Sequence, residues 1–314
     1  MTRAPAPSMP RSSANDLHGF LAIDKSPGWS SHDVVARVRK LTGVRRVGHA
    51  GTLDPFASGL LIVGVGKATR LIQYVQRTTK IYRATLRLGE ETDTLDPEGE
   101  IIHRIENPEW PSRLNVERAV AGFVGNIDQV PPAYSAIHID GKRSYELARA
   151  GEAVDIPSRT VTVNAIDIDA YEPPKLELTI SCETGTYIRS LARDIGRELD
   201  TYAYCTALRR TAVGSFQIEQ AIDLDSLTAE DLRERWADLA SPPEVTVAGF
   251  PAVTLTGPQT TAWYHGQSLS DLPGKPGGDS ETLVRVYSAS GGFAGLGTFD
   301  ETDGLRPMLV YTTG

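Results

Sequence analysis

The chain has 314 residues, of which 40% are hydrophobic and 23% charged, and this length predicts two domains or one large domain with an appendage. The net charge of −8 argues at first against a nucleic-acid partner. The chain has only two cysteines, Cys182 and Cys205, which excludes a disulfide framework and a zinc cluster and fits a reducing cytoplasm. No apolar run is long enough to span a bilayer, which excludes a helical membrane protein.

In chain order, residues 1–17 are rich in Pro, Ser and Ala and predict a disordered tail rather than a secretory signal. A strand is expected over 19–25. A helix capped by Ser31 is then expected through Leu41, with its valines on one face and Gly43 as the stop. Further on, the pattern predicts a strand at 80–88, a polar turn at 91–99, a short strand at 100–104 and a short helix at 116–123.

Residues 126–156 carry prolines, tyrosines and bases but only a weak core pattern, which is typical of a protruding functional insertion. The following segments predict a hairpin of strands at 161–170 and 176–182, a helix at 188–199, a strand at 207–218 and a helix at 225–239. Ser241-Pro242-Pro243 marks a boundary. Short strands beyond it, at 283–287, 293–299 and 306–311, predict a small β domain. We therefore expect one domain over 18–244 and a second over 245–314.

Asp54 is the most informative residue of the chain. It lies in the segment Gly48-His49-Ala50-Gly51-Thr52-Leu53-Asp54-Pro55, between a basic helix and an apolar run. The two glycines permit backbone angles that other residues resist, and Pro55 biases Asp54 toward an extended conformation. No second acid lies within twenty residues on either side, which favours a nucleophile or base over a metal ligand. The alternative is an Asx-turn, in which Asp54 only caps its own loop.

Charge is unevenly distributed along the chain. From Ser30 to Glu90 there are eleven Lys and Arg residues and three acids, a net charge of +8 around Asp54. From Thr211 to the C-terminus there are fourteen acids and five bases, a net charge of −9. A basic zone around a candidate site is typical of an interface with a phosphate backbone, although a solvated basic surface would show the same pattern.

Five motifs, in this order, resemble those of the bacterial tRNA pseudouridine-55 synthases of the TruB type. They are Asp24-Lys25-Ser26-Pro27-Gly28 with Ser30-Ser31, the segment from Arg46 to Pro55, Lys80-Ile81-Tyr82-Arg83-Ala84, Gly185-Thr186-Tyr187-Ile188-Arg189 and Leu208-Arg209-Arg210. The resemblance runs from about Gly19 to the C-terminus. It implies an α+β pseudouridine synthase fold, with a mixed, largely antiparallel central sheet flanked by helices, an RNA-binding thumb at 126–156 and a small PUA-like C-terminal β domain.

The resemblance also implies the reaction. Uridine 55 in the TΨC loop of tRNA would be isomerised to pseudouridine by cleavage of the C1′–N1 bond, rotation of the base and formation of a C1′–C5 bond. The base has to leave the stack to reach a side chain, so the enzyme flips it into a pocket. Because the reaction is redox-neutral, no cofactor and no metal are expected. The expected partner is tRNA, bound by a cytoplasmic monomer.

Three residues are expected to carry the catalysis. The resemblance implies that Asp54 is the catalytic residue. Covalent addition to the base, attack at C1′ and abstraction of the C2′ proton all remain open for it. Tyr82 resembles the tyrosine that stacks on the flipped base and serves in the final proton transfer. Arg189 sits at a helix start, where a cation is unfavourable with the helix dipole, and Asp54 is the candidate partner that would hold it there.

Four further residues are expected at the substrate. Tyr187 resembles a second tyrosine of the pocket, Leu208 an apolar pocket wall, and His49 a histidine that contacts RNA near the flipped nucleotide. Lys25 resembles a basic residue in a motif that supports the active-site loops. As bare residues, Tyr82, Tyr187 and Leu208 would be assigned to the core. Two other classes are alternatives: an RNA-binding or tRNA-folding protein, and an N-glycosylase that would release uracil.

Overall fold

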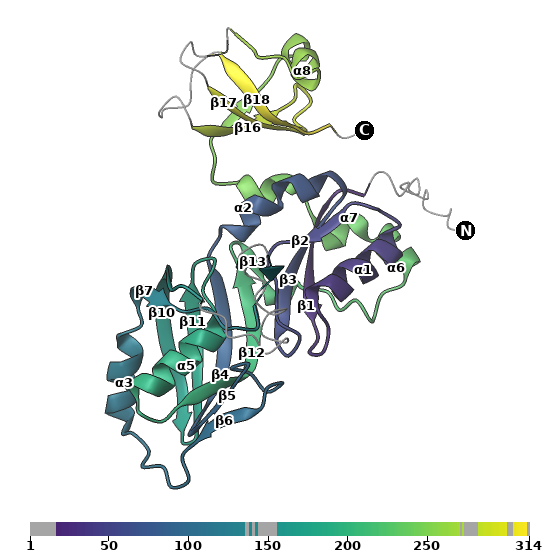
Figure 1. Ribbon diagram of the computed structural model, residues 1–314. Coiled ribbons are helices and arrows are strands. Elements are labelled where there is room, and N and C mark those ends of the chain that lie inside the picture. The colour runs from purple at the N-terminus through teal and green to yellow at the C-terminus, as the bar shows by residue number, and fades with distance from the viewer. Residues whose placement is uncertain are drawn as a thin grey trace, which may run out of the picture.

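The computed structural model describes residues 17–135, 138–139, 142–143, 156–270, 272, 282–299 and 304–312. A large central sheet carries most of the chain, and a smaller sheet lies beyond it at the C-terminal end (Figure 1). The central sheet has the strand order β14 (Ala240–Ser241), β1 (Gly19–Lys25), β3 (Ser58–Val65), β12 (Ala203–Val213), β4 (Lys80–Leu88), β11 (Lys175–Cys182), β10 (Arg159–Glu172) and β7 (Gly125–Gln129).

Two short strands extend this sheet, because β2 (Val47–His49) pairs with β3 and β13 (Phe216–Gln217) pairs with β12. Neighbouring strands are antiparallel except β3 and β12, which run parallel. The predicted mixed, largely antiparallel sheet is therefore confirmed. β5 (Glu90–Thr92) and β6 (Ile101–Arg104) form a separate hairpin, as do β8 (His138–Ile139) and β9 (Lys142–Arg143).

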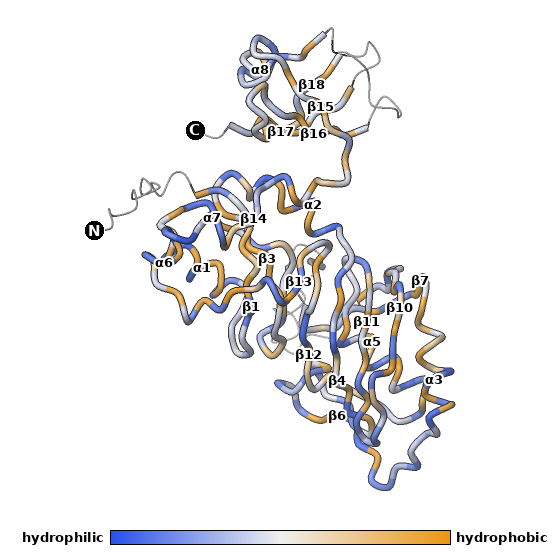
Figure 2. Tube along the Cα trace, turned by 180° about the vertical axis from the view of Figure 1, so that it is seen from behind, coloured by the Kyte–Doolittle hydropathy of each residue, from blue (hydrophilic) through white to orange (hydrophobic). Residues whose placement is uncertain are grey.

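Helices cover the sheet at both ends. Near β1 lie α1 (Ser31–Thr42), α6 (Ala229–Glu234) and α7 (Trp236–Leu239), and at the other end lie α3 (Arg113–Ala121) and α5 (Ile188–Glu198) (Figure 1). One hydrophobic core joins the buried valines of α1 and the apolar face of α5 to the strands. Figure 2 shows the apolar stretch along β3, whose residues from Gly59 to Val65 are all buried. In the described part of the chain, no helix is long and apolar enough to cross a membrane.

Helix α1 begins one residue earlier than expected. Its N-cap is Ser30, whose hydroxyl accepts a hydrogen bond from the Asp33 backbone N–H, while the Asp33 carboxylate accepts from the Ser30 backbone N–H. The assignment of Ser31 as the cap was therefore wrong. Ser31 is the first helical residue, and it is buried with its hydroxyl directed at another part of the chain. The predicted stop at Gly43 is confirmed, with a left-handed backbone (φ 72°).

Two other predicted elements are divided in the structure. The helix expected over 225–239 is two short helices, α6 and α7, which are separated at Arg235. The strand expected over 207–218 begins at Ala203 and ends at Val213, where a turn through Gly214 (φ 55°) leads into β13 and a 3-10 turn, η3 (Ile218–Gln220). In both cases the apolar pattern continues through a turn, so the pattern alone did not reveal the break.

The C-terminal sheet consists of β15 (Ala252–Thr254), β16 (Leu283–Tyr287), β17 (Phe293–Phe299) and β18 (Leu305–Val310). The three predicted strands are confirmed, while β15 and the helix α8 (Gly257–Tyr264) were not anticipated. Trp263 of α8 is fully buried and donates from Nε1 to the Ala294 carbonyl. All six acids of residues 245–314 lie outside the described residues, and the described part carries only the charges of Arg285 and Arg306.

The C-terminal sheet packs on the segment that follows β3. This segment comprises a 3-10 helix, η2 (Gly66–Leu71), and α2 (Ile72–Gln76), with η4 (Pro243–Val247) nearby. Phe293, Leu309 and Tyr311 share one buried cluster with apolar residues of β1, β3 and η2. Lys67 Nζ donates to the Thr312 carbonyl, and Arg70 Nη1 donates to the Val310 carbonyl at 2.7 Å. Two cations of the basic zone, Lys67 and Arg70, thus bind the C-terminal segment.

About half of the predicted insertion over 126–156 lies outside the described residues, namely 136–137, 140–141 and 144–155. Its first residues, 126–129, belong to the edge strand β7 of the central sheet. Of the tail predicted over 1–17, only Leu17 is described, and it is buried.

Gly59 is a position where the fold requires glycine. Its φ is +98°, and a Cβ added there would lie 2.3 Å from the Arg210 carbonyl oxygen, on the one parallel strand pair of the central sheet. We expect Gly59→Ala to lower the free energy of unfolding by about 2 kcal/mol or more, because the backbone would have to move. Urea unfolding measures this, with Gly249→Ala as the control, since nothing lies within 4 Å of a Cβ at Gly249. Equal stability of the two variants would contradict the close approach.

Candidate active site

Asp54 lies in the loop that joins β2 to β3, residues 50–57. Ser31 of α1 holds the centre of this loop, because its hydroxyl accepts from the Leu53 N–H at 2.9 Å and donates to the Leu53 carbonyl at 3.2 Å. Lys25, at the end of β1, donates from Nζ to the carbonyls of Trp29 at 2.7 Å and of Pro55 at 3.3 Å. Both sides of the Asp54 backbone are therefore tied to the central sheet and α1.

Arg210 of β12 also holds the Asp54 loop in place. Its side chain is fully buried and donates from Nε to the Leu60 carbonyl at 2.7 Å and from Nη2 to the Gly51 carbonyl at 3.1 Å. Its charge also acts on Tyr82: burial raises the pKa of the Tyr82 hydroxyl, and the Arg210 guanidinium beside it opposes that rise. Arg210 was part of a motif in the sequence, but nothing in the sequence indicated that it holds the loop.

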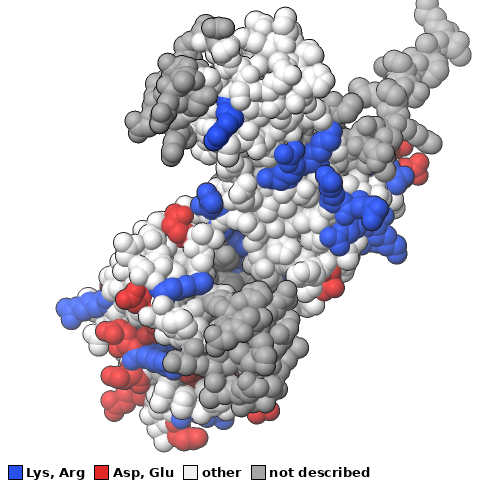
Figure 3. Space-filling view, turned by 45° about the horizontal axis from the view of Figure 1, so that its top comes forward, with Lys and Arg blue, Asp and Glu red and all other residues white. Residues whose placement is uncertain are grey.

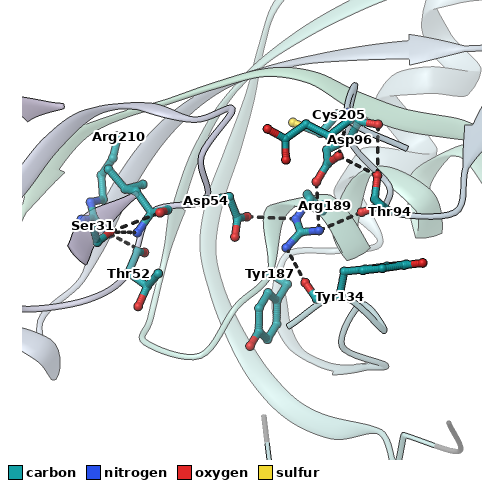
Figure 4. Close-up of polar contacts among 12 residues, drawn as sticks. Ser31, Thr52, Asp54, Thr94, Asp96, Tyr134, Tyr187, Arg189, Cys205 and Arg210 are labelled. Carbon is teal, nitrogen blue, oxygen red and sulfur yellow. Dashed lines mark hydrogen bonds and ion pairs between the residues drawn. The ribbon is translucent and has the colours of Figure 1, made fainter. Parts of the chain in front are cut away.

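Arg189 joins Asp54 to a second acid. Figure 4 shows its guanidinium between Asp54 and Asp96. Nε lies 2.9 Å from Asp54 Oδ2, as an ion pair without the alignment of a hydrogen bond. Nη1 donates to Asp96 Oδ2 at 3.0 Å and to the Thr94 carbonyl at 2.8 Å, and Nη2 donates to the Tyr134 carbonyl at 3.0 Å. The structure thus brings Arg189 and Asp54 together as the helix-dipole argument predicted.

Asp96 is the member of this cluster that the sequence analysis missed. Its side chain is only 5% exposed, and its Oδ1 accepts from Thr94 Oγ1 at 2.6 Å and from the Glu98 N–H at 3.0 Å. In the sequence it is one of several acids in a polar turn, and none of them is distinguished from the others. The sequence offered one signal for a second partner. An arginine has five N–H donors, and Asp54 alone cannot accept hydrogen bonds from all of them, so Arg189 needs further acceptors.

A cavity opens above the ion pair. Its wall includes Asp54, Tyr82, Tyr187, Arg189 and Leu208, which are five of the residues predicted for the site. The Asp54 side chain is 32% exposed toward this cavity, whereas that of Arg189 is only 4% exposed. Tyr82 and Leu208 come from the neighbouring strands β4 and β12. Four other acids, Asp93, Asp96, Glu98 and Glu100, also belong to the cavity wall; Asp54 is the partly exposed acid that the buried Arg189 guanidinium orients, alongside the aromatic and apolar residues of the wall.

Two predicted residues lie outside the cavity wall. Lys25 is fully buried beneath the loop, where burial lowers the pKa of its ammonium to about 8 although the Asp54 charge opposes this. His49 is half-buried and meets His32 edge to face, with ring centroids 5.6 Å apart, and His32 itself lines the cavity. Burial lowers the pKa of His49, and the charges of His32 and Arg210 add to this effect. His32 was not singled out from the sequence.

Charge on the molecular surface is unevenly distributed. Figure 3 shows Lys and Arg side chains gathered on the part of the molecule below the C-terminal sheet, while acids gather at the opposite end. The exposed cations of the basic zone include Lys40, Arg45, Arg46 and Arg77. Across the described ranges, no three His, Cys, Asp or Glu side chains are placed to hold a metal ion.

Comparison with known proteins gives the family. Residues 39–188 match the TruB family pseudouridylate synthase (N terminal domain), residues 189–241 the tRNA pseudouridylate synthase B C-terminal domain, and residues 251–310 the C-terminal part of pseudouridine synthase II TruB. The tRNA pseudouridine synthase B of Thermobifida fusca is 44% identical over 301 residues, which cover 93% of this chain and 98% of that protein. The chain belongs to the TruB family. It is a pseudouridine synthase, an enzyme that isomerises uridine to pseudouridine.

Other TruB relatives and two solved structures agree with this assignment. The tRNA pseudouridine synthase B of Arthrobacter sp. is 46% identical, with 94% of this chain and 97% of that protein covered. A chain of an H/ACA RNP bound to a substrate RNA containing 2′-deoxyuridine has a TM-score of 0.71 and 25% identity, over 95% of this chain and 86% of its own. A chain of a Cbf5–Nop10–Gar1 complex has a TM-score of 0.69 and 26% identity, over 95% and 85%. The predicted pseudouridine synthase fold is thereby confirmed.

Proposed function

We propose that this TruB-family enzyme isomerises uridine 55 in the TΨC loop of tRNA. The observation that carries the proposal is the pair of Asp54 and Arg189 at the floor of the cavity. The pair combines a partly exposed carboxylate with a buried cation that orients it. A protein that only binds RNA gains nothing from a carboxylate facing its ligand, since the phosphates repel it.

In this proposal Asp54 is the catalytic residue. Tyr82 stacks on the flipped uracil from β4 and serves in the final proton transfer from C5, while Tyr187 and Leu208 close the cavity around the base. Arg189 orients Asp54 through their ion pair. These roles are supported by the position of the side chains in the wall of one cavity.

We assign His49 and Lys25 to supporting positions. His49 packs against His32, whose side chain lines the cavity where the nucleotides next to the target would stack. Lys25 lies under the Asp54 loop and donates to the Pro55 carbonyl of that loop, so its contribution to substrate binding passes through the loop. The structure gives its ammonium group three carbonyl partners, of Ser26, Trp29 and Pro55.

The proposal also includes the organisation of the protein. We propose a cytoplasmic monomer with a catalytic domain over 18–244, a thumb over 126–156 and a PUA-like domain over 245–314. Support for the division comes from the separate C-terminal sheet and from its own buried cluster around Trp263.

Incubation of the purified protein with unmodified tRNA tests the proposal. We expect pseudouridine at position 55 when the product is mapped at single-nucleotide resolution. A transcript with cytidine at that position is the control and should remain unmodified. Release of free uracil would indicate an N-glycosylase, and binding without any change in the tRNA would indicate an RNA-binding protein. Modification at another position would overturn the substrate assignment while keeping the reaction.

Affinity for tRNA is expected to fall steeply with salt although the sequence pI is about 5.3. Each phosphate that a cation neutralises steepens log K against log salt by about 0.9 in duplex regions. Replacing Arg45 and Arg46, both exposed, with Gln should therefore make the slope shallower by about one per residue. Arg113→Gln is the control, because Arg113 pairs with Glu117 on α3 at the other end of the sheet. An unchanged slope in the double variant would contradict phosphate binding by this zone.

A further inference from the structure

Two strands meet at the base of the predicted thumb. β7 ends at Gln129 and β10 begins at Arg159, and these two residues are partners in the antiparallel register. The side chains of both contact Tyr187, the cavity residue that immediately precedes helix α5. Gln129 and Arg159 are therefore the last pair of the two strands before residues 130–158, and the same pair contacts the active site through Tyr187.

Gln129 holds the backbone of Tyr187 at both of its polar groups. Its side chain is fully buried, with Oε1 accepting from the Tyr187 N–H at 2.8 Å and Nε2 donating to the Tyr187 carbonyl at 3.1 Å. Tyr187 is the N-cap residue of α5 but provides no side-chain cap. Its carbonyl accepts the first helical hydrogen bond, from the Leu191 N–H at 3.0 Å. Gln129 therefore fixes the residue from which the first turn of α5 starts.

Arg159 holds the ring of the same tyrosine. Its guanidinium lies over the Tyr187 ring, 4.9 Å from the centroid, and its Nη2 donates to the Gly185 carbonyl. A planar guanidinium over an aromatic face is a favourable cation–π arrangement that also limits how the ring can turn. Backbone and ring of Tyr187 are thus held by two residues that face each other across one strand pair.

The same unit includes Arg189, which follows Tyr187 by two residues in the first turn of α5. Its Nη2 donates to the Tyr134 carbonyl, and Ser190 Oγ and Arg193 Nη2 both donate to the Val130 carbonyl. We propose that Gln129 and Arg159 are positioning residues, which set the orientation of Tyr187 and Arg189 and thereby that of Asp54. This inference rests on the proposed function, in which those three side chains meet the flipped uridine.

Gln129→Glu tests the first half of the proposal. The two side chains have the same shape, but a carboxylate accepts from the Tyr187 N–H and cannot donate to the Tyr187 carbonyl. We expect the single-turnover rate at saturating tRNA to fall about 10- to 100-fold, as a small misplacement of reacting groups does, with the Kd for tRNA within about threefold of wild type. A wild-type rate at saturation, or a loss confined to Kd, would overturn the proposal.

Arg159→Lys tests the second half without adding a buried charge, and it remains informative if Gln129→Glu does not fold. It keeps the positive charge but loses the planar group over the ring, and we expect a fall of about three- to tenfold in the same rate. Thr162→Ala is the matched control, because Thr162 of β10 faces Asn126 of β7 in the register and donates from Oγ1 to the Asn126 amide oxygen on the exposed side, outside the predicted thumb. An equal loss in the control would show general damage to the strand pair and would also overturn the proposal.

Hydrogen exchange without RNA separates this inference from the proposed function. In Gln129→Glu the first turn of α5 loses one anchor, so the amides of residues 187–191 should exchange about tenfold faster than in wild type, while Thr162→Ala leaves them unchanged. If the wild-type protein left uridine 55 unmodified, the proposed function would fail, and the exchange result would still decide whether Gln129 holds Tyr187. Unchanged exchange in Gln129→Glu would overturn the anchoring itself.

Discussion

Asp54→Asn is expected to abolish pseudouridine formation while the protein stays folded and binds tRNA. Asn keeps the size and polarity of the side chain but removes the charge and the nucleophilic or basic oxygen, so the turnover should fall by about 10³-fold or more. Affinity for tRNA should be equal or higher, since a carboxylate beside RNA phosphates is repulsive. Pseudouridine formation and tRNA binding are measured on the same folded sample.

The competing interpretation, a loop cap, predicts the opposite result. Asn makes the same local hydrogen bonds to backbone N–H groups as Asp, so a capping Asp54 would be replaced almost without effect. Asp223→Asn is the matched control, because the Asp223 carboxylate accepts from the Asp225 N–H in a turn away from the cavity. Substantial turnover in Asp54→Asn would remove Asp54 from the mechanism.

Arg189→Ala is the second variant with a large expected effect. It should lower both the stability of the protein and its catalytic rate. Asp96 would stay buried without its cation, and such a stranded charge costs about 3–5 kcal/mol of stability. Asp54 is partly exposed, so the loss of its cation should cost less stability, but Asp54 would lose the group that orients it. We therefore expect both a lower free energy of unfolding, by urea titration, and a single-turnover rate reduced by about 10²-fold or more.

The two effects can be separated experimentally. Adding Asp96→Asn to Arg189→Ala removes the stranded charge, so stability should recover in part while the rate stays low. Arg113→Ala is the control: Arg113 pairs with Glu117 on α3, both side chains are about half exposed (50% and 48%), and loss of such an exposed pair has a small effect. A rate that recovered together with stability would show that Arg189 has only a structural role.

Much of the fold could be predicted because local rules and packing agree over most elements. The alternation of β4 and the apolar face of α5 are both buried where expected, and Gly43 ends α1. Prediction failed where an apolar pattern runs through a turn, as at Gly214, and where two serines compete for one cap. Ser30 caps α1, which leaves Ser31 free to hold the Asp54 loop.

The site could be predicted from the sequence only where a residue needs a partner of opposite charge. A cation at a helix start requires an acid, and this identified the pair of Arg189 and Asp54. The free donors of Arg189 indicated that a further acceptor was needed, but Asp96 could not be singled out among the acids of the 91–99 turn, because its burial results from the fold of that turn and not from its neighbours in sequence. The same holds for Arg210 and Gln129, which are polar residues whose acceptors and donors are backbone groups of distant segments.

The four contacts of Arg189 also determine when the active site can form. Its partners Tyr134, Asp96, Thr94 and Asp54 precede it by 55 to 135 residues, so each contact closes a long loop of chain. Contacts of such separation form slowly and only after the strands between them are paired. During refolding from denaturant, we therefore expect the recovery of activity to lag behind the recovery of secondary structure.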